Sequence, residues 1–100
     1  MIKRIVRLTF RPAEVDAFLA LFEERKQLIR HFKGCHHLEL LRDKHRPNQF
    51  FTLSVWEDEA ALNAYRHSSL FAETWKNTKA KFEERAAAWT VELAVSTEKE

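Results

Sequence analysis

Glycine and proline, the residues that most often interrupt helices and strands, occupy only three positions in this 100-residue chain: Pro12, Gly34 and Pro47. Because tight turns depend on these residue types, their scarcity predicts long regular elements joined by few turns. Hydrophobic residues make up 45% and charged residues 32%, the balance of an ordinary globular domain. The length suits one domain, and we expect it to span residues 1–95, with 96–100 as a polar tail.

The composition argues against several classes of protein. The net charge is only +2, with 17 basic and 15 acidic residues, so we expect no nucleic-acid partner. A single cysteine, Cys35, cannot form an internal disulfide or a cysteine-based zinc cluster, and it predicts a reducing compartment, the cytoplasm. No apolar stretch is long enough to span a bilayer, and the apolar run at the N-terminus carries charges. We therefore expect neither a membrane partner nor a signal peptide.

The first half of the chain predicts a strand, a helix and a second strand. Residues 2–10 alternate, with mostly apolar side chains at even positions and mixed ones at odd positions. Pro12 suits the first turn of a helix, and apolar residues then recur at helical spacing. Gly34 is expected to end that helix in a left-handed conformation, and residues 35–43 are expected to form the second strand.

The second half predicts a strand, two helices and a last strand. Residues 49–56 are rich in aromatic and β-branched side chains and follow a polar loop, as expected for a hairpin. Carboxylates at 57–59 suit the first turn of a short helix. Ser68 or Ser69 can cap a second helix that we expect to include Phe82. The last strand is predicted over residues 87–95.

This order of elements is that of an α+β ferredoxin-like split βαβ fold with a four-stranded antiparallel sheet and its helices on one face. We expect the other face to expose a set of apolar side chains: Phe50, Trp56, Ile5 and part of Leu38, Leu40 and Leu41. A monomer rarely leaves so large an apolar patch uncovered. A second copy packed sheet to sheet, giving a homodimer, is the simplest remedy.

Three segments resemble one known family. Residues 55–71 (VWEDEAALNAYRHSSLF) place a tryptophan at a strand end before two helices, residues 6–12 (VRLTFRP) form a strand and turn, and residues 32–35 (FKGC) begin the next strand. Together they resemble the antibiotic biosynthesis monooxygenase (ABM) superfamily. That resemblance implies a dimeric α/β barrel built from ferredoxin-like folds. The family includes cofactor-free oxygenases of aromatic polyketides and quinols, haem-degrading enzymes and proteins without a known substrate.

The resemblance gives Trp56 and Thr52 expected roles. In the family's aromatic oxygenases a tryptophan at this strand end lines the substrate pocket, and an asparagine four residues earlier helps to bind the substrate. Trp56 matches the tryptophan, whereas Thr52 stands at the asparagine position and offers one hydroxyl in place of an amide. The alternative for Trp56 is a purely structural role between strand and helix, which is commoner for large aromatic residues.

His67 is the candidate catalytic base. It lies beside Tyr65 at the junction of two predicted helices, where pockets of the family open, and an imidazole there could take a proton from a phenol or quinol. A surface or helix-capping role would explain it equally well. Tyr65, Phe50 and Trp75 are the further candidates for lining a substrate pocket.

Arg7 is the remaining candidate for substrate binding. It lies on the wetter face of the first predicted strand, where its guanidinium could bind an acidic or phenolate group. It could equally pair with Glu39 or Glu92 across the sheet, which is the commoner use of such a residue.

We expect no cofactor and no metal. The family's haem-degrading branch uses an asparagine, a tryptophan and a histidine ligand, and those positions here hold Val6, Tyr65 and Trp75. An indole cannot ligate iron. The five histidines also lack a recognisable ligand spacing.

The sequence thus predicts a cofactor-independent monooxygenase that acts on an aromatic phenol or quinol with O₂. The alternative is a non-catalytic dimeric module that binds a small hydrophobic molecule or a protein partner. Clustered catalytic polar groups would favour the enzyme, and an aromatic pocket with scattered polar residues would favour the binding module.

Overall fold

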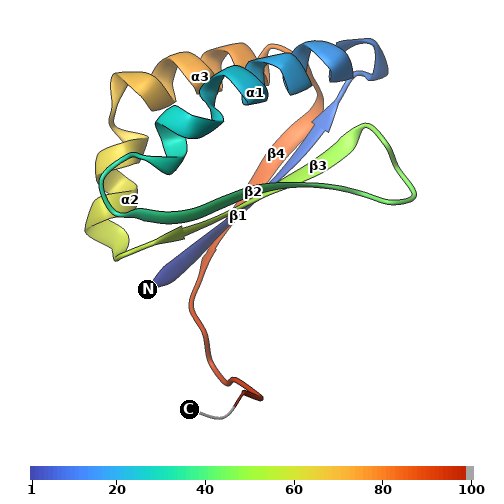
Figure 1. The fold of residues 1–100 in the computed structure, drawn as a ribbon. Coiled ribbons are helices and arrows are strands. Elements are labelled where there is room, and N and C mark those ends of the chain that lie inside the picture. The colour runs from blue at the N-terminus through green and yellow to red at the C-terminus, as the bar shows by residue number, and fades with distance from the viewer. Residues whose placement is uncertain (99–100) are drawn as a thin grey trace.

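In the computed structural model, which describes residues 1–98, three helices cover one face of a four-stranded antiparallel sheet (Figure 1). The elements are β1 (Ile2–Phe10), a 3₁₀ turn (Pro12–Glu14), α1 (Val15–Arg30), β2 (Cys35–Arg42), β3 (Gln49–Trp56), α2 (Glu59–Arg66), α3 (Ser69–Lys79) and β4 (Phe82–Val91). The strand order is β2-β3-β1-β4, which confirms the ferredoxin-like α+β fold. Within residues 1–98, no helix is long and apolar enough to cross a membrane.

Side-chain caps define the two helices that follow β3. The Asp58 carboxylate accepts a hydrogen bond from the backbone N–H of Ala61 at 2.9 Å, so it caps α2. The Ser68 hydroxyl accepts one from the backbone N–H of Phe71 at 3.1 Å, so Ser68 rather than Ser69 caps α3. Each cap satisfies a backbone donor that a helix start otherwise leaves without a partner.

The last strand differs from the prediction at both ends. It covers Phe82–Val91 instead of 87–95, and Leu93 and Val95 lie beyond it as exposed residues. Phe82 continues the helical spacing of the residues before it, so the sequence predicts it in the helix. In the structure it pairs with Phe10 of β1, and the two rings lie 5.4 Å apart. Burial against the sheet therefore overrides the local helical pattern.

The predicted open face is wrong for Phe50 and Trp56. Both lie beneath the helices, with exposed fractions of 2% and 1%. The cause is the register between β1 and β3, which sets Ile2 opposite Trp56 and Leu8 opposite Phe50. Residues directly opposite in an antiparallel pair share a face, so these two aromatic residues join the apolar even positions of β1.

The open face carries a different apolar set. Leu38 and Leu40 also lie on the covered face, because they pair with Ser54 and Thr52 of β3. Ile5 and Leu41 remain on the open face, together with Phe51, Leu53, Val55 and Trp89. Of these, Trp89 and Leu41 are almost half exposed. The face thus remains apolar, although its members differ from those expected.

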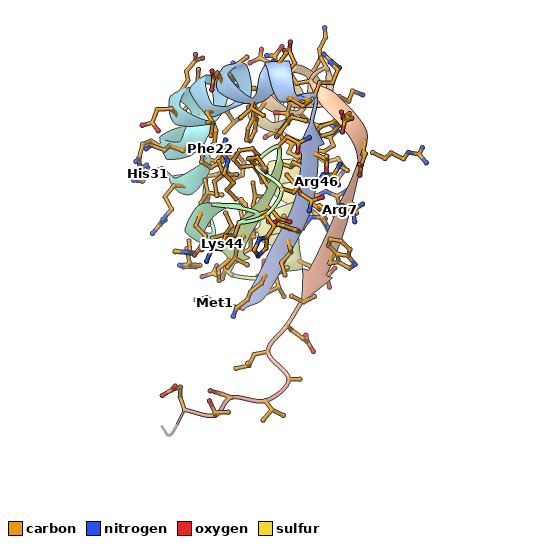
Figure 2. All side chains as sticks on the ribbon, turned by 90° about the vertical axis from the view of Figure 1, so that its right-hand side faces the viewer. Met1, Arg7, Phe22, His31, Lys44 and Arg46 are labelled. Atoms are coloured by element: carbon orange, nitrogen blue, oxygen red, sulfur yellow. The ribbon has the colours of Figure 1, made fainter. Side chains whose placement is uncertain are left out.

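Two clusters fill the space between helices and sheet. The phenylalanine core consists of Leu8, Phe10, Phe18 and Phe50, and its three rings lie 4.1–5.9 Å apart. The second cluster consists of Cys35, Trp56 and Leu62, with Phe32 and Tyr65 packed against it. Phe22 of α1 points from its helix towards the sheet (Figure 2) and packs against the phenylalanine core.

Gly34 brings α2 close to the start of β2. Its φ of +90° is in the left-handed region, as predicted, but α1 ends earlier, at Arg30. Its carbonyl accepts a hydrogen bond from the backbone N–H of Glu57 at 2.8 Å. A Cβ at this position would lie 2.5 Å from the Cβ of Ala61, so only glycine allows this close approach.

Candidate functional site

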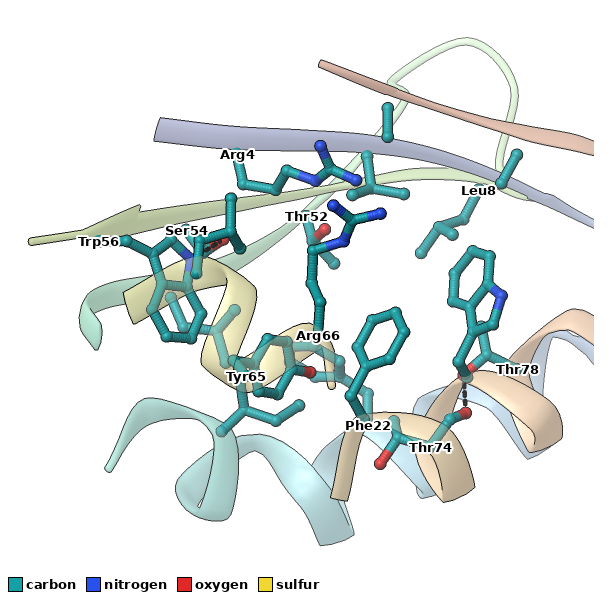
Figure 3. Close-up of a pocket in the computed structure, with 18 of the residues that line it drawn as sticks. Arg4, Leu8, Phe22, Thr52, Ser54, Trp56, Tyr65, Arg66, Thr74 and Thr78 are labelled. Carbon is teal, nitrogen blue, oxygen red and sulfur yellow. Dashed lines mark hydrogen bonds between the residues drawn. The ribbon is translucent and has the colours of Figure 1, made fainter. Parts of the chain in front are cut away.

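A cavity of about 320 Å³ lies between the sheet and the helices (Figure 3). The covered faces of β1 and β3 form one wall, and α2 and α3 form the other. Aromatic side chains supply much of the lining: Trp56, Tyr65, Phe71 and Trp75. Such a concave, mainly apolar space with a few polar groups is typical of a small-molecule site.

Trp56 is fixed in the wall by its neighbours. It ends β3, and its indole N–H donates a hydrogen bond to the Ser54 hydroxyl at 2.9 Å. Its ring stacks on that of Tyr65 at 5.0 Å with an interplanar angle of 24°, and Phe32 packs edge-on against it at 6.4 Å. Trp56 therefore joins β3 to α2 and also lines the cavity, so the structural and the pocket-lining interpretations are compatible.

The aromatic wall continues from α2 along α3. Tyr65 meets Phe71 edge-on at 5.3 Å, and Phe71 stacks on Trp75 at 5.9 Å. Burial, with a smaller contribution from Cys35, raises the pKa of the Tyr65 hydroxyl well above its usual value. The hydroxyl therefore stays protonated near neutral pH and can donate a hydrogen bond to a ligand.

Two arginines enter the same cavity from opposite walls. Arg4 lies on the covered face of β1, opposite Ser54, and Arg66 is the last residue of α2. Their guanidinium groups point towards the same part of the cavity, near Thr52 (Figure 3). One nitrogen of Arg4 donates to the Thr90 hydroxyl at 2.8 Å. Burial, and then the charge of Arg66, lowers the pKa of Arg4.

Four of the seven residues predicted for the site line this cavity: Thr52, Trp56, Tyr65 and Trp75. They come from β3, α2 and α3, so the fold brings together residues that are separated in the sequence. The hydroxyls of Thr52 and Tyr65 are the hydrogen-bonding groups in this set.

The other three predicted residues lie elsewhere. Phe50 belongs to the phenylalanine core. Arg7 lies on the open face, on the side of β1 away from α1 (Figure 2), and it forms no ion pair within residues 1–98. His67 is exposed at the end of α2, where its Nδ1 lies 2.8 Å from the carbonyl oxygen of Asn63. Its position gives the base assignment no support.

Sequence reasoning missed Arg4 and Arg66. Arg4 carries a usable signal, because it is the one charge among the apolar even positions of the first strand. Arg66 carries none, because an arginine near a helix C-terminus is explained by the helix dipole alone. Only the folded chain brings the two together.

The described part of the chain offers no metal site of the usual kind. Within residues 1–98, no group of three or more histidine, cysteine, aspartate or glutamate side chains is placed to hold a metal ion. His37, for example, lies 2.6 Å from Glu39 on the exposed face of β2, where the two make a surface pair. The polar groups of the cavity are hydroxyls and guanidiniums, which are poor metal ligands.

The sequence matches the family profile of antibiotic biosynthesis monooxygenases over residues 1–89. The chain belongs to this family. No curated protein sequence matches it.

Solved structures share the fold. A crystal structure described as an antibiotic biosynthesis monooxygenase superposes with a TM-score of 0.89 at 22% identity, covering 95% of this chain and 100% of that one. A protein from Mycobacterium tuberculosis gives a TM-score of 0.87 at 16% identity, with 97% and 98% covered. A conserved protein from Methanosarcina mazei gives 0.85 at 18% identity, with 89% and 88% covered. At these identities the likeness extends to the fold alone.

Proposed function

We propose that the chain is a cofactor-independent monooxygenase, an oxidoreductase that converts an aromatic phenol or quinol to a quinone with O₂. The observation that carries this proposal is an aromatic-walled cavity in a member of the monooxygenase family, with Trp56 at the strand end. For a simple phenol the reaction is phenol plus O₂ giving quinone plus water. The substrate loses two hydrogens and gains one oxygen atom, and it supplies all four electrons.

The cavity offers three things that this chemistry needs. Its aromatic walls reduce the contact of a bound anion with water, which strengthens the electrostatic contacts on that side. The hydroxyls of Thr52 and Tyr65 can hydrogen-bond a substrate oxygen. Its volume of about 320 Å³ is at the lower end of the range for ligand pockets, so it suits a small aromatic molecule.

The test is oxygen uptake with a panel of phenols and quinols, run in air and under nitrogen. A substrate should consume one O₂ for each quinone formed, with ¹⁸O₂ placing one labelled atom in the product and the other in water. Formation of hydrogen peroxide in place of water would identify an oxidase. Quinone formation at the same rate under nitrogen would contradict the proposal.

A non-catalytic binding module is the second candidate, and one observation favours it. Among the lining residues in the described chain there is no histidine, aspartate, glutamate or cysteine, so no side chain with the usual properties of a general base faces the cavity. Tight binding of an aromatic ligand without any oxygen uptake across the panel would favour the binding module over the enzyme.

We also propose that two copies pair through their open sheet faces, as the apolar set around Leu53 and Trp89 suggests. Light scattering at micromolar concentration should then give twice 11.9 kDa. Leu53→Glu should yield a monomer, because it buries a charge at the centre of that face. Leu28→Glu is the matched control on the exposed side of α1 and should stay dimeric. A monomeric parent protein would overturn the proposal.

A further inference from the structure

Arg4 and Arg66 form a pair of like charges that lacks a counter-charge. Both line the cavity, and their guanidinium groups converge on the space beside Thr52 (Figure 3). Within residues 1–98, neither of them is ion-paired with a carboxylate. The acceptor found for this pair is the neutral Thr90 hydroxyl, which takes one hydrogen bond from Arg4.

This arrangement favours the binding of an anion. Arg4 is partly buried and Arg66 is exposed, so water still solvates the pair, but two like charges that face each other repel, and an anion placed between them relieves that repulsion. The lowered pKa of Arg4, which comes from burial and from Arg66, agrees with this picture. The remaining ionisable group in the described lining is Tyr65, which stays neutral, so the protein itself provides no anion there.

We propose that Arg4 and Arg66 form a subsite for the ionised oxygen of an aromatic ligand, a phenolate or an aromatic carboxylate. The ring of this ligand lies among Trp56, Tyr65 and Trp75 while its anionic oxygen accepts hydrogen bonds from the two guanidiniums. Planar guanidiniums suit such oxygens because each presents several donors in a fixed geometry. This inference deepens the proposed function by naming the substrate form that the cavity selects.

The aromatic lining decides the class of anion. A small, strongly hydrated anion such as phosphate would meet the two arginines but would also lose water against the apolar walls, which offer it no hydrogen bond in return. An aromatic anion instead buries its ring against Trp56 and Tyr65 and leaves one charged end for the arginines.

The subsite also removes the need for a base in the cavity. A phenol gives its proton to solvent water, and the phenolate that remains is held by the two positive charges, which lower the pKa of the bound phenol. The acidic limb of a rate profile then moves with the acidity of the substrate. A base of the protein would fix that limb at its own pKa, whichever substrate is used.

The experiment uses 4-nitrophenol, whose ionised form is yellow, titrated with the full-length protein under nitrogen. Bound nitrophenol should ionise at a lower pH than the free compound. Arg66→Gln should reduce this shift and weaken binding about 10- to 100-fold, the usual effect of losing a charge-assisted hydrogen bond. Arg4→Gln should act in the same direction. Arg85→Gln removes an exposed charge from β4 outside the cavity lining, so affinity and shift should match the parent protein.

Two further ligands distinguish binding of the ring alone from binding of the anion, and a phenolate subsite from a carboxylate subsite. 4-Nitroanisole cannot ionise, so it should bind equally to the parent protein and to Arg66→Gln. 4-Nitrobenzoate tests the carboxylate: a 10- to 100-fold loss in Arg66→Gln without a nitrophenol shift would assign the subsite to carboxylates. Unchanged binding of both anions in Arg66→Gln, with circular dichroism showing an intact fold, would overturn the proposal. Binding of phosphate alone would overturn the aromatic class.

These outcomes stand apart from those for the monooxygenase proposal, because the titration needs neither O₂ nor turnover. A shift in the pKa of bound nitrophenol, in a protein that consumes no O₂, would contradict the monooxygenase proposal and support the anion subsite. O₂ uptake without any effect of either arginine variant on anion binding would support the monooxygenase proposal and contradict the anion subsite.

Discussion

The layer between the helices and the sheet is filled around the phenylalanine core, the filled end, and hollow around Arg4 and Thr52, the hollow end, which the cluster around Trp56 closes on its far side. At the filled end Phe10, Phe18 and Phe50 pack ring against ring. Towards the other end of the same strands, on the same face, Arg4 of β1 and Ser54 of β3 line the cavity. β1 and β3 keep one register through both ends, whereas the pairing of β1 with β4 shifts at Thr9, so the cavity arises from the size and polarity of a few inward-facing side chains together with this local irregularity. A binding site can therefore be made in this fold without an added loop.

The largest effect is expected at the filled end. Phe10 is fully buried, so Phe10→Ala should lower the free energy of unfolding by about 3–5 kcal/mol through lost burial and a new void. Thr52→Ala at the hollow end removes atoms that already border empty space and should cost less than about 1 kcal/mol. Urea denaturation at one fixed protein concentration measures both. Equal losses would mean that the two ends are packed alike.

Gly34→Ala tests how the hollow end is held together. The substitution forces a side chain into a left-handed conformation and against Ala61, and we expect a loss of about 1–3 kcal/mol in the free energy of unfolding. Adding Ala61→Gly to this variant relieves the contact and leaves the backbone strain, so stability should return only in part. If Gly34→Ala alone is as stable as the parent protein, α2 can move away from residue 34 without loss of stability.

Thr52→Leu should make the hollow end resemble the filled one. The larger apolar side chain occupies cavity space, so affinity for an aromatic ligand should fall at least about tenfold, or ~1.4 kcal/mol. Stability should change less than this, because the added atoms enter space that is already empty. Calorimetric titration measures the affinity, and Gln27→Leu on the exposed side of α1 is the control. Unaltered affinity would place the ligand elsewhere.

The smallest expected effect is a loss of thermal stability at alkaline pH. Burial raises the pKa of the Cys35 thiol above its reference value of 9.0 and also raises the pKa of Tyr65, so both neutral forms are favoured in the folded state. Their stabilising effect is complete below the unfolded-state pKa values and is lost as the pH rises through the folded ones. The melting temperature should therefore fall above about pH 9. Cys35→Ala with Tyr65→Phe should flatten this fall, and an equally steep fall would contradict the cause given.

The sequence predicts the bounds of a strand correctly where a change of residue type marks its end. The expected bounds of β1 and β3 are those observed, because alternating apolar residues end at Pro12 and at the acidic residues after Trp56. The boundary between α3 and β4 carries neither glycine nor proline. Without such a break the helical spacing predicts Phe82 in the helix, and only its pairing with Phe10 places it in the sheet.

The face of a strand was harder to predict than the strand itself. In β3 both faces carry large apolar side chains, as Phe50 and Phe51 illustrate, so alternation alone does not say which face the helices cover. The register with β1 decides it. For the site, the aromatic residues could be named because they follow family motifs. The pairing of Arg4 with Arg66 joins a strand to a helix end far along the chain, and local patterns contain no such information.

The strand order has a consequence for synthesis of the chain. β1 lies inside the sheet, and both of its neighbours, β3 and β4, come later in the sequence, so β1 is synthesised before either of them. At about 5–20 residues per second on the ribosome, β1 waits several seconds for its last neighbour. An unpaired strand of this kind can join another nascent chain and aggregate. Lys3, Arg4 and Arg7 place three positive charges within it, and their mutual repulsion disfavours such pairing until the sheet closes.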